Sequence, residues 1–166
     1  NRSGDLDLWV QSVRDGSIFA VTRDADADWD PAFTPDGTAI LWSSNRVTGV
    51  LEIWRAEFDP SRLREKVLPV PYRVSSDGED AENPTMSAGA NAVVYASSNR
   101  QAPGIWTVRP DGGKPTALVG GPLFYIPDVS PSGQYAAYLQ VDAVNQINTI
   151  RVVELAGSRD ARFQIA

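Results

Sequence analysis

Apolar residues occur along this chain in short runs of β-branched and aromatic side chains, separated by turns rich in Pro, Asp, Gly and Ser. The clearest run is Ile40, Leu41 and Trp42, which follows a Pro-Asp-Gly turn at residues 35–37. Runs of this kind, bounded by turn residues, are typical of β-strands. None of them approaches the roughly 18 apolar residues that a membrane span requires. The pattern therefore predicts an all-β chain without a transmembrane segment.

The segment around that run recurs. Residues 31–46 correspond to residues 84–100 and, more loosely, to residues 127–140. Anchor positions between these copies lie 45, 52 and 45 residues apart. The anchors are Trp9, Trp54, Trp106 and the degenerate Arg151. A repeat of about 43 to 53 residues that holds four short strands matches the blade of a β-propeller.

We therefore predict antiparallel four-stranded propeller blades, about three and a half of them. A half blade spans residues 1–23, and full blades span residues 24–76, 77–120 and 121–166. The Asp59-Pro60 pair predicts a short helix in the connection from 59 to 71. The predicted strands are 7–13, 18–22, 30–34, 39–44, 51–58, 72–75, 83–87, 93–97, 104–109, 116–119, 125–130, 135–141, 149–155 and 162–165.

Several residues recur in register, which favours a structural role for them. Trp9, Trp54 and Trp106 are predicted to pack between blades, and Pro31, Pro84 and Pro127 to mark the innermost strands. Arg46 and Arg100 each close a Ser-Asn-Arg triplet and are expected to pair with an acidic residue of an adjoining loop, such as Asp80 or Glu82. The second copy has one extra residue and no Pro-Asp-Gly, which predicts a looser turn or a bulge there.

Composition and charge exclude several classes of function. The chain has 166 residues, a net charge of −6 and no basic run, so a nucleic acid backbone would be repelled. It has no Cys and no His, which removes disulfides, thiolate nucleophiles, imidazole bases and the usual zinc ligands. A Ser-His-Asp set is thereby excluded within this chain. We expect no cofactor.

Four carboxylates alternate in Asp24, Asp26, Asp28 and Asp30, and would point to one side of an extended chain. Such hard oxygen ligands suit Ca²⁺, which makes Asp24, Asp26 and Asp28 a calcium candidate. The favoured alternative is a solvated loop between blades, because the Gly and the distal Glu of an EF-hand loop are absent.

Trp29 has its counterpart in Tyr125, beside Phe124, and residues entering an innermost strand lie at one mouth of a propeller's channel. There, with Asp28, Asp30 and Glu82, these aromatic rings could contact a partner or a ligand. Packing against the neighbouring blade is the favoured alternative. A carboxylate pair for glycoside hydrolysis stays formally open, although nothing in the sequence pairs any two of the candidates. Those candidates are Asp28, Asp30, Glu79, Asp80 and Glu82.

The repeat resembles that of the TolB-type β-propellers of bacterial envelope proteins. The resemblance is carried by Asp-x-x-Pro, Phe-Thr-Pro-Asp-Gly, the apolar strand, Ser-Asn-Arg and Ile-Trp, almost complete in residues 28–46 with Trp54. It implies a propeller fold and a periplasmic or extracellular location. It also implies a non-enzymatic scaffold or interaction module, or alternatively the accessory propeller of a peptidase or glycosidase whose catalytic residues lie outside this chain.

Three and a half blades cannot close a ring of the usual four to eight. Both end blades should then leave an apolar face and a strand edge uncovered. We therefore expect completion by another chain, by a further segment of the same gene product, or by self-association. The chain begins at Asn1 without Met or an apolar leader, which fits a removed signal peptide or a piece of a longer protein.

Overall fold

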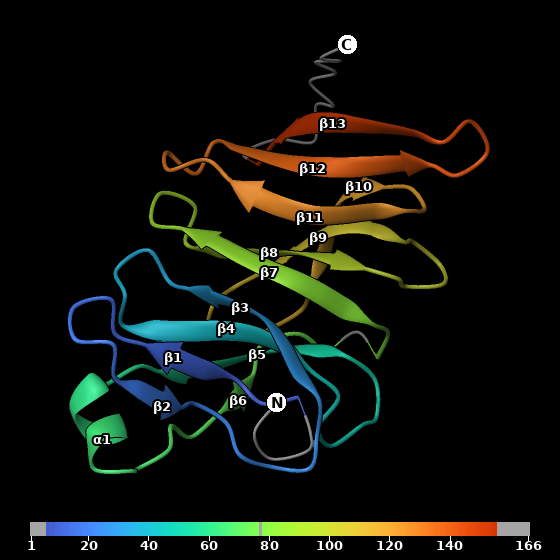
Figure 1. Cartoon of the computed structure of the whole chain (residues 1–166). Coiled ribbons are helices and arrows are strands. Elements are labelled where there is room, and N and C mark those ends of the chain that lie inside the picture. Colours follow the sequence, from blue (N-terminus) through green and yellow to red (C-terminus); the bar gives the residue numbers. More distant parts are fainter. Residues whose placement is uncertain (1–5, 77, 156–166) are drawn as a thin grey trace.

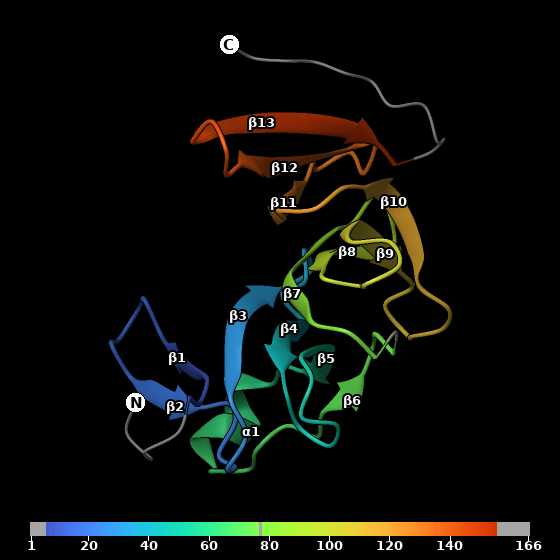
Figure 2. The ribbon, with the colours of Figure 1, turned by 90° about the vertical axis from the view of Figure 1, so that its right-hand side faces the viewer.

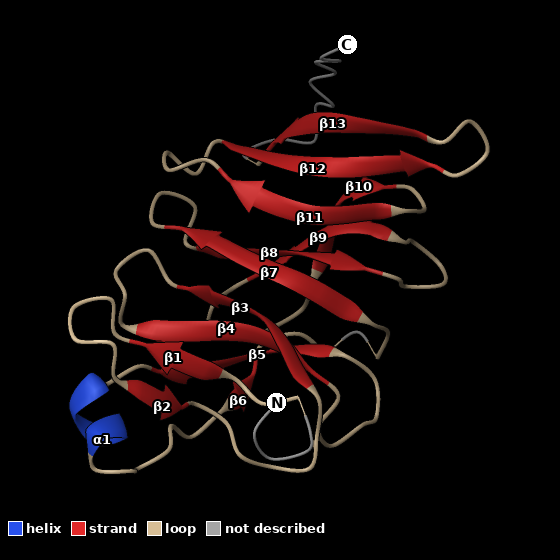
Figure 3. Cartoon of the chain, viewed as in Figure 1, coloured by secondary structure: helices blue, strands red, loops and turns tan. Residues whose placement is uncertain are grey.

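The computed structural model of the chain describes residues 6–76 and 78–155. In this part nearly all regular structure is β-strand, with one short helix (Figure 3). None of its helices is long and apolar enough to cross a membrane. The strand predicted at 162–165 lies outside the described residues.

The strands form four antiparallel sheets, each a meander in sequence order. The first sheet pairs β1 (Trp9–Gln11) with β2 (Ile18–Ala20). The second holds β3 (Asp28–Phe33), β4 (Ala39–Ser44), β5 (Glu52–Glu57) and β6 (Tyr72–Arg73). The third holds β7 (Ala81–Ser87), β8 (Ala92–Ser97), β9 (Gly104–Val108) and β10 (Thr116–Gly120). The fourth holds β11 (Phe124–Val129), β12 (Tyr135–Asp142) and β13 (Ile147–Glu154).

The sheets are stacked face to face in sequence order (Figure 1). Viewed at right angles, they fan out from the side where β3, β7 and β11 follow one another (Figure 2). These strands contact each other in turn, β3 with β7 and β7 with β11. They are therefore the innermost strands of a partial propeller, as the repeat predicts.

Three apolar cores fill the spaces between successive sheets. In β4, Ile40 and Trp42 face the first sheet, whereas Leu41 between them faces the third. In β8, Val93 and Tyr95 face the second sheet, and Val94 and Ala96 face the fourth. Successive side chains of a strand point to opposite faces, so the central strands read as continuous apolar runs because both of their faces are covered.

Each innermost strand contains the same β-bulge. Asp30, Asn83 and Ile126 have φ of 52°, 53° and 50°, and each directly precedes the proline of its strand. The two bulged residues oppose a single buried aromatic residue of the next strand, which is Trp42, Tyr95 or Tyr138. We predicted a bulge or looser turn only in the second copy, near residues 88–91. That turn does end with Asn91 at φ 45°, but the ladder shifts earlier, between Glu82 and Thr85.

The predicted helix is present as α1 (Pro60–Arg64). The Asp59 carboxylate accepts hydrogen bonds from the backbone N–H and the hydroxyl of Ser61, at 2.9 and 2.6 Å. Within the helix, Leu63 is the buried residue. The N-cap read from the sequence therefore forms in the structure.

The repeated tryptophans differ in burial. Trp54 is buried in the core between the first two sheets, beside the more deeply buried Trp42. Trp106 is partly buried against the next core, and its indole N–H donates to the carbonyl of Ala102 at 2.9 Å. Trp9 is half-buried, because the sheet that carries it has only two described strands.

Candidate functional site

The innermost strands bring three of the predicted contact residues to equivalent places. Trp29, Glu82 and Tyr125 each lie two residues before the proline of β3, β7 and β11. Burial raises the pKa of the Glu82 carboxyl, and an interaction with the Trp29 side chain of the adjacent sheet lowers it in part. Equivalent positions of adjacent blades therefore interact across the start of the inner strands.

The residues that follow them form a chain of hydrogen bonds across the three strands. The backbone N–H of Asn83 donates to Oδ2 of Asp30 at 3.3 Å, and the N–H of Ile126 donates to Oδ1 of Asn83 at 3.4 Å. In each case the side chain of one bulge accepts from the backbone of the next. The chain stops at Ile126, whose side chain has no acceptor.

A pocket of about 180 Å³ opens between the third and fourth sheets at this end. Its walls include the carboxylates of Asp80 and Glu82 together with Phe124 and Tyr125. Asp80 is already engaged, because its Oδ1 accepts the backbone N–H of Leu51 at 3.0 Å. The volume is below the roughly 300 Å³ of most small-molecule sites, so the pocket suits a single side chain of a partner.

The pKa values of two carboxyl groups near this pocket are raised. Partial burial raises the pKa of Glu82, and the neighbouring charges of Asp30 and Asp80 raise it further. Burial likewise raises the pKa of Asp30, although the N–H of Asn83 partly offsets that effect. A cation or a hydrogen-bond donor placed here would relieve the cost of ionising these groups.

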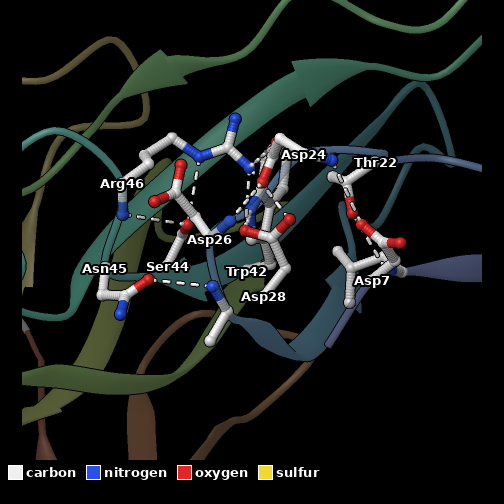
Figure 4. A network of polar contacts seen from close by, with 11 residues as sticks. Asp7, Thr22, Asp24, Asp26, Asp28, Trp42, Ser44, Asn45 and Arg46 are labelled. Atoms are coloured by element: carbon white, nitrogen blue, oxygen red, sulfur yellow. Dashed lines mark hydrogen bonds and ion pairs between the residues drawn. The ribbon is translucent and has the colours of Figure 1, made fainter. Parts of the chain in front are cut away.

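Asp28 lies apart from this pocket, in a polar network between the first and second sheets (Figure 4). Its side chain is fully buried, and it accepts two hydrogen bonds from Arg46 at 2.8 and 3.0 Å and one from the Trp42 indole at 3.0 Å. The Arg46 guanidinium also bonds to Ser44 Oγ at 3.0 Å and lies over the Trp42 and Trp54 rings. Because Asp28 is buried and satisfied, it is not exposed for contact with a partner.

Arg46 does pair with an acidic residue of an adjoining loop, as predicted, but the partners named for it are wrong. Arg46 pairs with Asp28 and with Asp24, at 3.2 Å, rather than with Asp80 or Glu82. Arg100 is 88% exposed and only approaches Glu79, at 3.8 Å. The reason is visible in the inner strands, where the place of Asp28 is taken by Ala81 in the third sheet, so Arg100 has no buried carboxylate to bind.

The carboxylates that lie together in the structure are not the three that were predicted to bind calcium. Asp7, Asp24 and Asp28 place carboxylate oxygens within 4.8 Å of one another, whereas Asp26 is not part of this group. The guanidinium of Arg46 bonds to two of the three, so it supplies the positive charge that a cation would otherwise bring. The sequence did not indicate Asp7, because it stands beside the Trp9 anchor and far along the chain from the alternating carboxylates of residues 24–30.

The structure thus brings together five of the six predicted contact residues and separates Asp28 from them. Asp80 is the pocket residue that was considered only as a partner for Arg46 or as one of a carboxylate pair. The sequence already paired Trp29 with Tyr125, and alignment of the three copies on their prolines adds Glu82 to the same position.

Solved structures share this arrangement of sheets. Putative TolB from Agrobacterium tumefaciens superposes with a TM-score of 0.70 and 18% identity, over 92% of this chain and 59% of that one. TolB from Acinetobacter baumannii gives 0.70 and 17%, over 94% and 36%. Porphyromonas gingivalis dipeptidyl peptidase 4 gives 0.62 and 14%, over 99% and 23%. No family model and no curated protein matches the chain.

This chain therefore spans 59% and 36% of the lengths of the two TolB proteins. At these identities the likeness concerns the fold alone, and it extends over most of the chain. The geometry of the sheets, their inner-strand bulges and these superpositions lead to one conclusion: the chain has the fold of a TolB-like β-propeller, of which it forms a part.

Proposed function

We propose that this chain is a non-enzymatic protein-interaction or scaffold module of the bacterial cell envelope, completed by another polypeptide or by self-association. The observation that carries the proposal is the state of the two end sheets. Each inner sheet face is covered by a neighbour, whereas the end sheets leave apolar surface exposed. Surfaces of that kind commonly mark protein interfaces.

The outer face of the fourth sheet illustrates this. Leu139 pairs with Tyr125 on one side and with Ile150 on the other, so these three side chains share a face. Ile150 is 55% exposed, and Tyr125 is 36% exposed. The opposite face carries Ala136 and Val153 in the core against the third sheet. A sheet that is apolar on both faces is built to be covered on both.

The pocket at the start of the inner strands offers a second contact point. Glu82 and Asp80 supply negative charge beside the aromatic ring of Phe124. A partner that presents a basic side chain would meet both the charge and the shape of this pocket. A protein partner fits the net charge of −6 better than a nucleic acid does, and the location outside the cytoplasm follows the implied family.

Light scattering on the isolated 166-residue chain tests the proposal. We expect assemblies larger than the monomer, or a stable complex when the protein is purified from its native source. A stable, monodisperse monomer that captures no partner would overturn the proposal.

A second candidate is the accessory propeller of a hydrolase. The superposition on Porphyromonas gingivalis dipeptidyl peptidase 4 over 99% of this chain is the observation that favours it. Mass analysis of the full-length product from its native source separates the two candidates. An additional catalytic domain on the same polypeptide would support the hydrolase and exclude the free-standing scaffold.

A further inference from the structure

Arg46 fills a space on the face of the second sheet that is turned toward the first sheet (Figure 4). It contacts four side chains of its own sheet through an ion pair, a hydrogen bond and two ring contacts, and these are Asp28, Ser44, Trp42 and Trp54. The four form two cross-strand pairs, because Asp28 lies opposite Ser44 and Trp42 lies opposite Trp54. The same space can therefore be located in another sheet by its register.

In the fourth sheet these places carry different side chains, on the face turned toward the third sheet. Two cross-strand pairs occupy them, Phe124 opposite Gln140 and Tyr138 opposite Arg151. Tyr138 belongs to the core between the third and fourth sheets, and Phe124 packs against that core. An arginine thus replaces the recurring tryptophan, and a phenylalanine replaces the buried aspartate.

An aspartate takes the place of Arg46 in the fourth sheet. Asp142 follows two residues after Gln140, as Arg46 follows two residues after Ser44. Its carboxylate accepts two backbone N–H groups at 3.0 Å each, within the turn that leads to β13. A cavity of about 180 Å³ remains, and its walls include both cross-strand pairs and the end of β10. The fourth sheet therefore leaves open a space that the second sheet fills with its own side chain.

This cavity lies between two sheets and is not the place of an absent strand. Its walls come from β10 of the third sheet and from β11, β12 and β13 of the fourth, all of which are described. In the second sheet the four contacts of Arg46 come from β3, β4 and β5, and the outermost strand β6 contributes none of them. An outermost strand is therefore not needed to enclose the space.

Arg151 brings a positive charge to the cavity. Its Nε–H donates to Oε1 of Gln140 at 2.7 Å, which holds the guanidinium in place. Within residues 6–76 and 78–155, Arg151 takes part in none of the ion pairs. The rings of Phe124 and Tyr138 contact each other, with centroids 4.9 Å apart, and form an apolar wall. A guanidinium presents a planar set of donors that matches a carboxylate.

We propose that this cavity binds a small carboxylate on a flat apolar body, which is the chemistry of an aryl carboxylate. The carboxylate pairs with Arg151 and supplies the negative charge that Asp28 provides to Arg46 in the second sheet. The apolar body lies against Phe124 and Tyr138. The volume is below the roughly 300 Å³ of most small-molecule sites, so the ligand is small. This site goes beyond the proposed function and does not depend on it.

Saturation-transfer NMR with benzoate tests the site, because it observes the ligand and tolerates assemblies of the chain. We expect saturable binding to the 166-residue protein with a dissociation constant on the order of 1 mM. Benzamide has nearly the same shape without the charge and should bind roughly tenfold more weakly. Acetate carries the charge of an acidic side chain without the ring, and it should also bind more weakly than benzoate.

Two matched variants assign the binding to Arg151. Arg151→Gln replaces the guanidinium with a neutral amide and should remove the preference for benzoate over benzamide. Arg100→Gln removes the same charge from a side chain that is 88% exposed, and should bind benzoate like the wild type. Arg151→Lys keeps the charge without the planar fork, and should keep part of the preference.

Absence of saturable benzoate binding, or equal binding of benzoate and benzamide by the wild type, would overturn this inference. So would equal losses in Arg151→Gln and Arg100→Gln, since binding would then follow net charge alone. Acetate binding as tight as that of benzoate would contradict the role of the aromatic wall. The comparisons of ligands on the wild type do not depend on the folding of any variant.

Discussion

Arg46 and Arg100 close the same triplet in successive repeats, yet their surroundings differ completely. The side chain of Arg46 is 10% exposed and pairs with a fully buried Asp28, whereas that of Arg100 is 88% exposed. A charge pair removed from water is costly to break because the remaining partner stays buried without compensation. The same residue type at the same repeat position can therefore stabilise one sheet and contribute little to the next.

We predict that Arg46→Ala lowers the free energy of unfolding by about 3 to 5 kcal/mol, since it leaves the Asp28 carboxylate buried and unpaired. The matched control is Arg100→Ala, which should change it by no more than about 0.5 kcal/mol. Urea unfolding followed by tryptophan fluorescence measures both. Equal losses in the two variants would contradict the network drawn from the structure.

Glu82 gives a pH-dependent prediction. Burial and the charges of Asp30 and Asp80 raise its pKa in the folded protein above the ordinary value of 4.5. The folded state then binds the proton more tightly than the unfolded state, so this group reduces stability as the pH rises from about 4.5 through the raised pKa. We predict that Glu82→Gln gains stability relative to the wild type over that interval and keeps the gain at neutral pH.

Thermal unfolding between pH 4 and pH 8 measures this difference. The control is Glu57→Gln at the exposed end of β5, where the side chain is 70% exposed and pairs with Arg55. Its melting temperature should follow that of the wild type across the range. A Glu82→Gln profile parallel to the wild type would contradict the effect of burial at Glu82.

The sequence predicts the roles of some of these residues but not their partners. Recurrence marks Ser-Asn-Arg and predicts a structural role for Arg46, but its partner depends on whether the preceding inner strand carries Asp28 or Ala81. Asp28 and Ala81 are equivalent because of the strand register at the bulge. A pattern of residue types does not show where a bulge lies. Trp29 and Glu82 were grouped in the prediction because both lie at the entry to an innermost strand, at one mouth of the channel.

At the scale of the elements, the bulge explains most differences between predicted and observed strands. The strand β3 begins at Asp28 rather than at residue 30, because pairing resumes on the other side of the bulge, where Asp28 faces Ser44. The strand β6 is shorter than predicted, although Val74 still donates its N–H to the Ile53 carbonyl. Runs of β-branched residues locate strands well, whereas their ends depend on contacts with the neighbouring strand.

The third bulge provides a prediction of its own. Asp30 and Asn83 tolerate positive φ, but Ile126 is β-branched and has φ 50°. A side chain of that kind in this conformation is strained by roughly 1 to 3 kcal/mol. Ile126 is 63% exposed, so little packing is lost when it is replaced. We predict that Ile126→Asn raises the free energy of unfolding by about 1 kcal/mol.

Urea unfolding of Ile126→Asn, compared with Ile150→Asn, separates the relief of backbone strain from the effect of placing a polar side chain on an exposed strand. Ile150 has a similar exposure of 55% but lies in the regular pairing of β12 with β13. Its replacement should not raise stability. A gain in both variants, or in neither, would show that the positive φ of Ile126 is not the cause.

At the scale of the whole molecule, each sheet depends on its neighbours. The central sheets are apolar on both faces because each has a neighbour on both sides, as the cores around β4 and β8 show. The repeat predicted this stacking, since it fixed both the number of strands per sheet and their order. It could not predict what covers the ends, because a repeat describes contacts between its own copies and carries no information about another surface.

The outer face of the fourth sheet allows a test of whether an end sheet also needs to be covered. Ile150 lies on it beside Leu139, 55% exposed, so a charge there meets water in the free chain but loses hydration when the face is covered. We predict that Ile150→Lys lowers the average mass in light scattering while the free energy of unfolding changes by no more than about 0.5 kcal/mol. Val144→Lys, 90% exposed in the loop between β12 and β13, introduces the same charge away from the face and should leave the mass unchanged. Equal masses for the two variants would exclude this face as the surface through which copies of the chain associate.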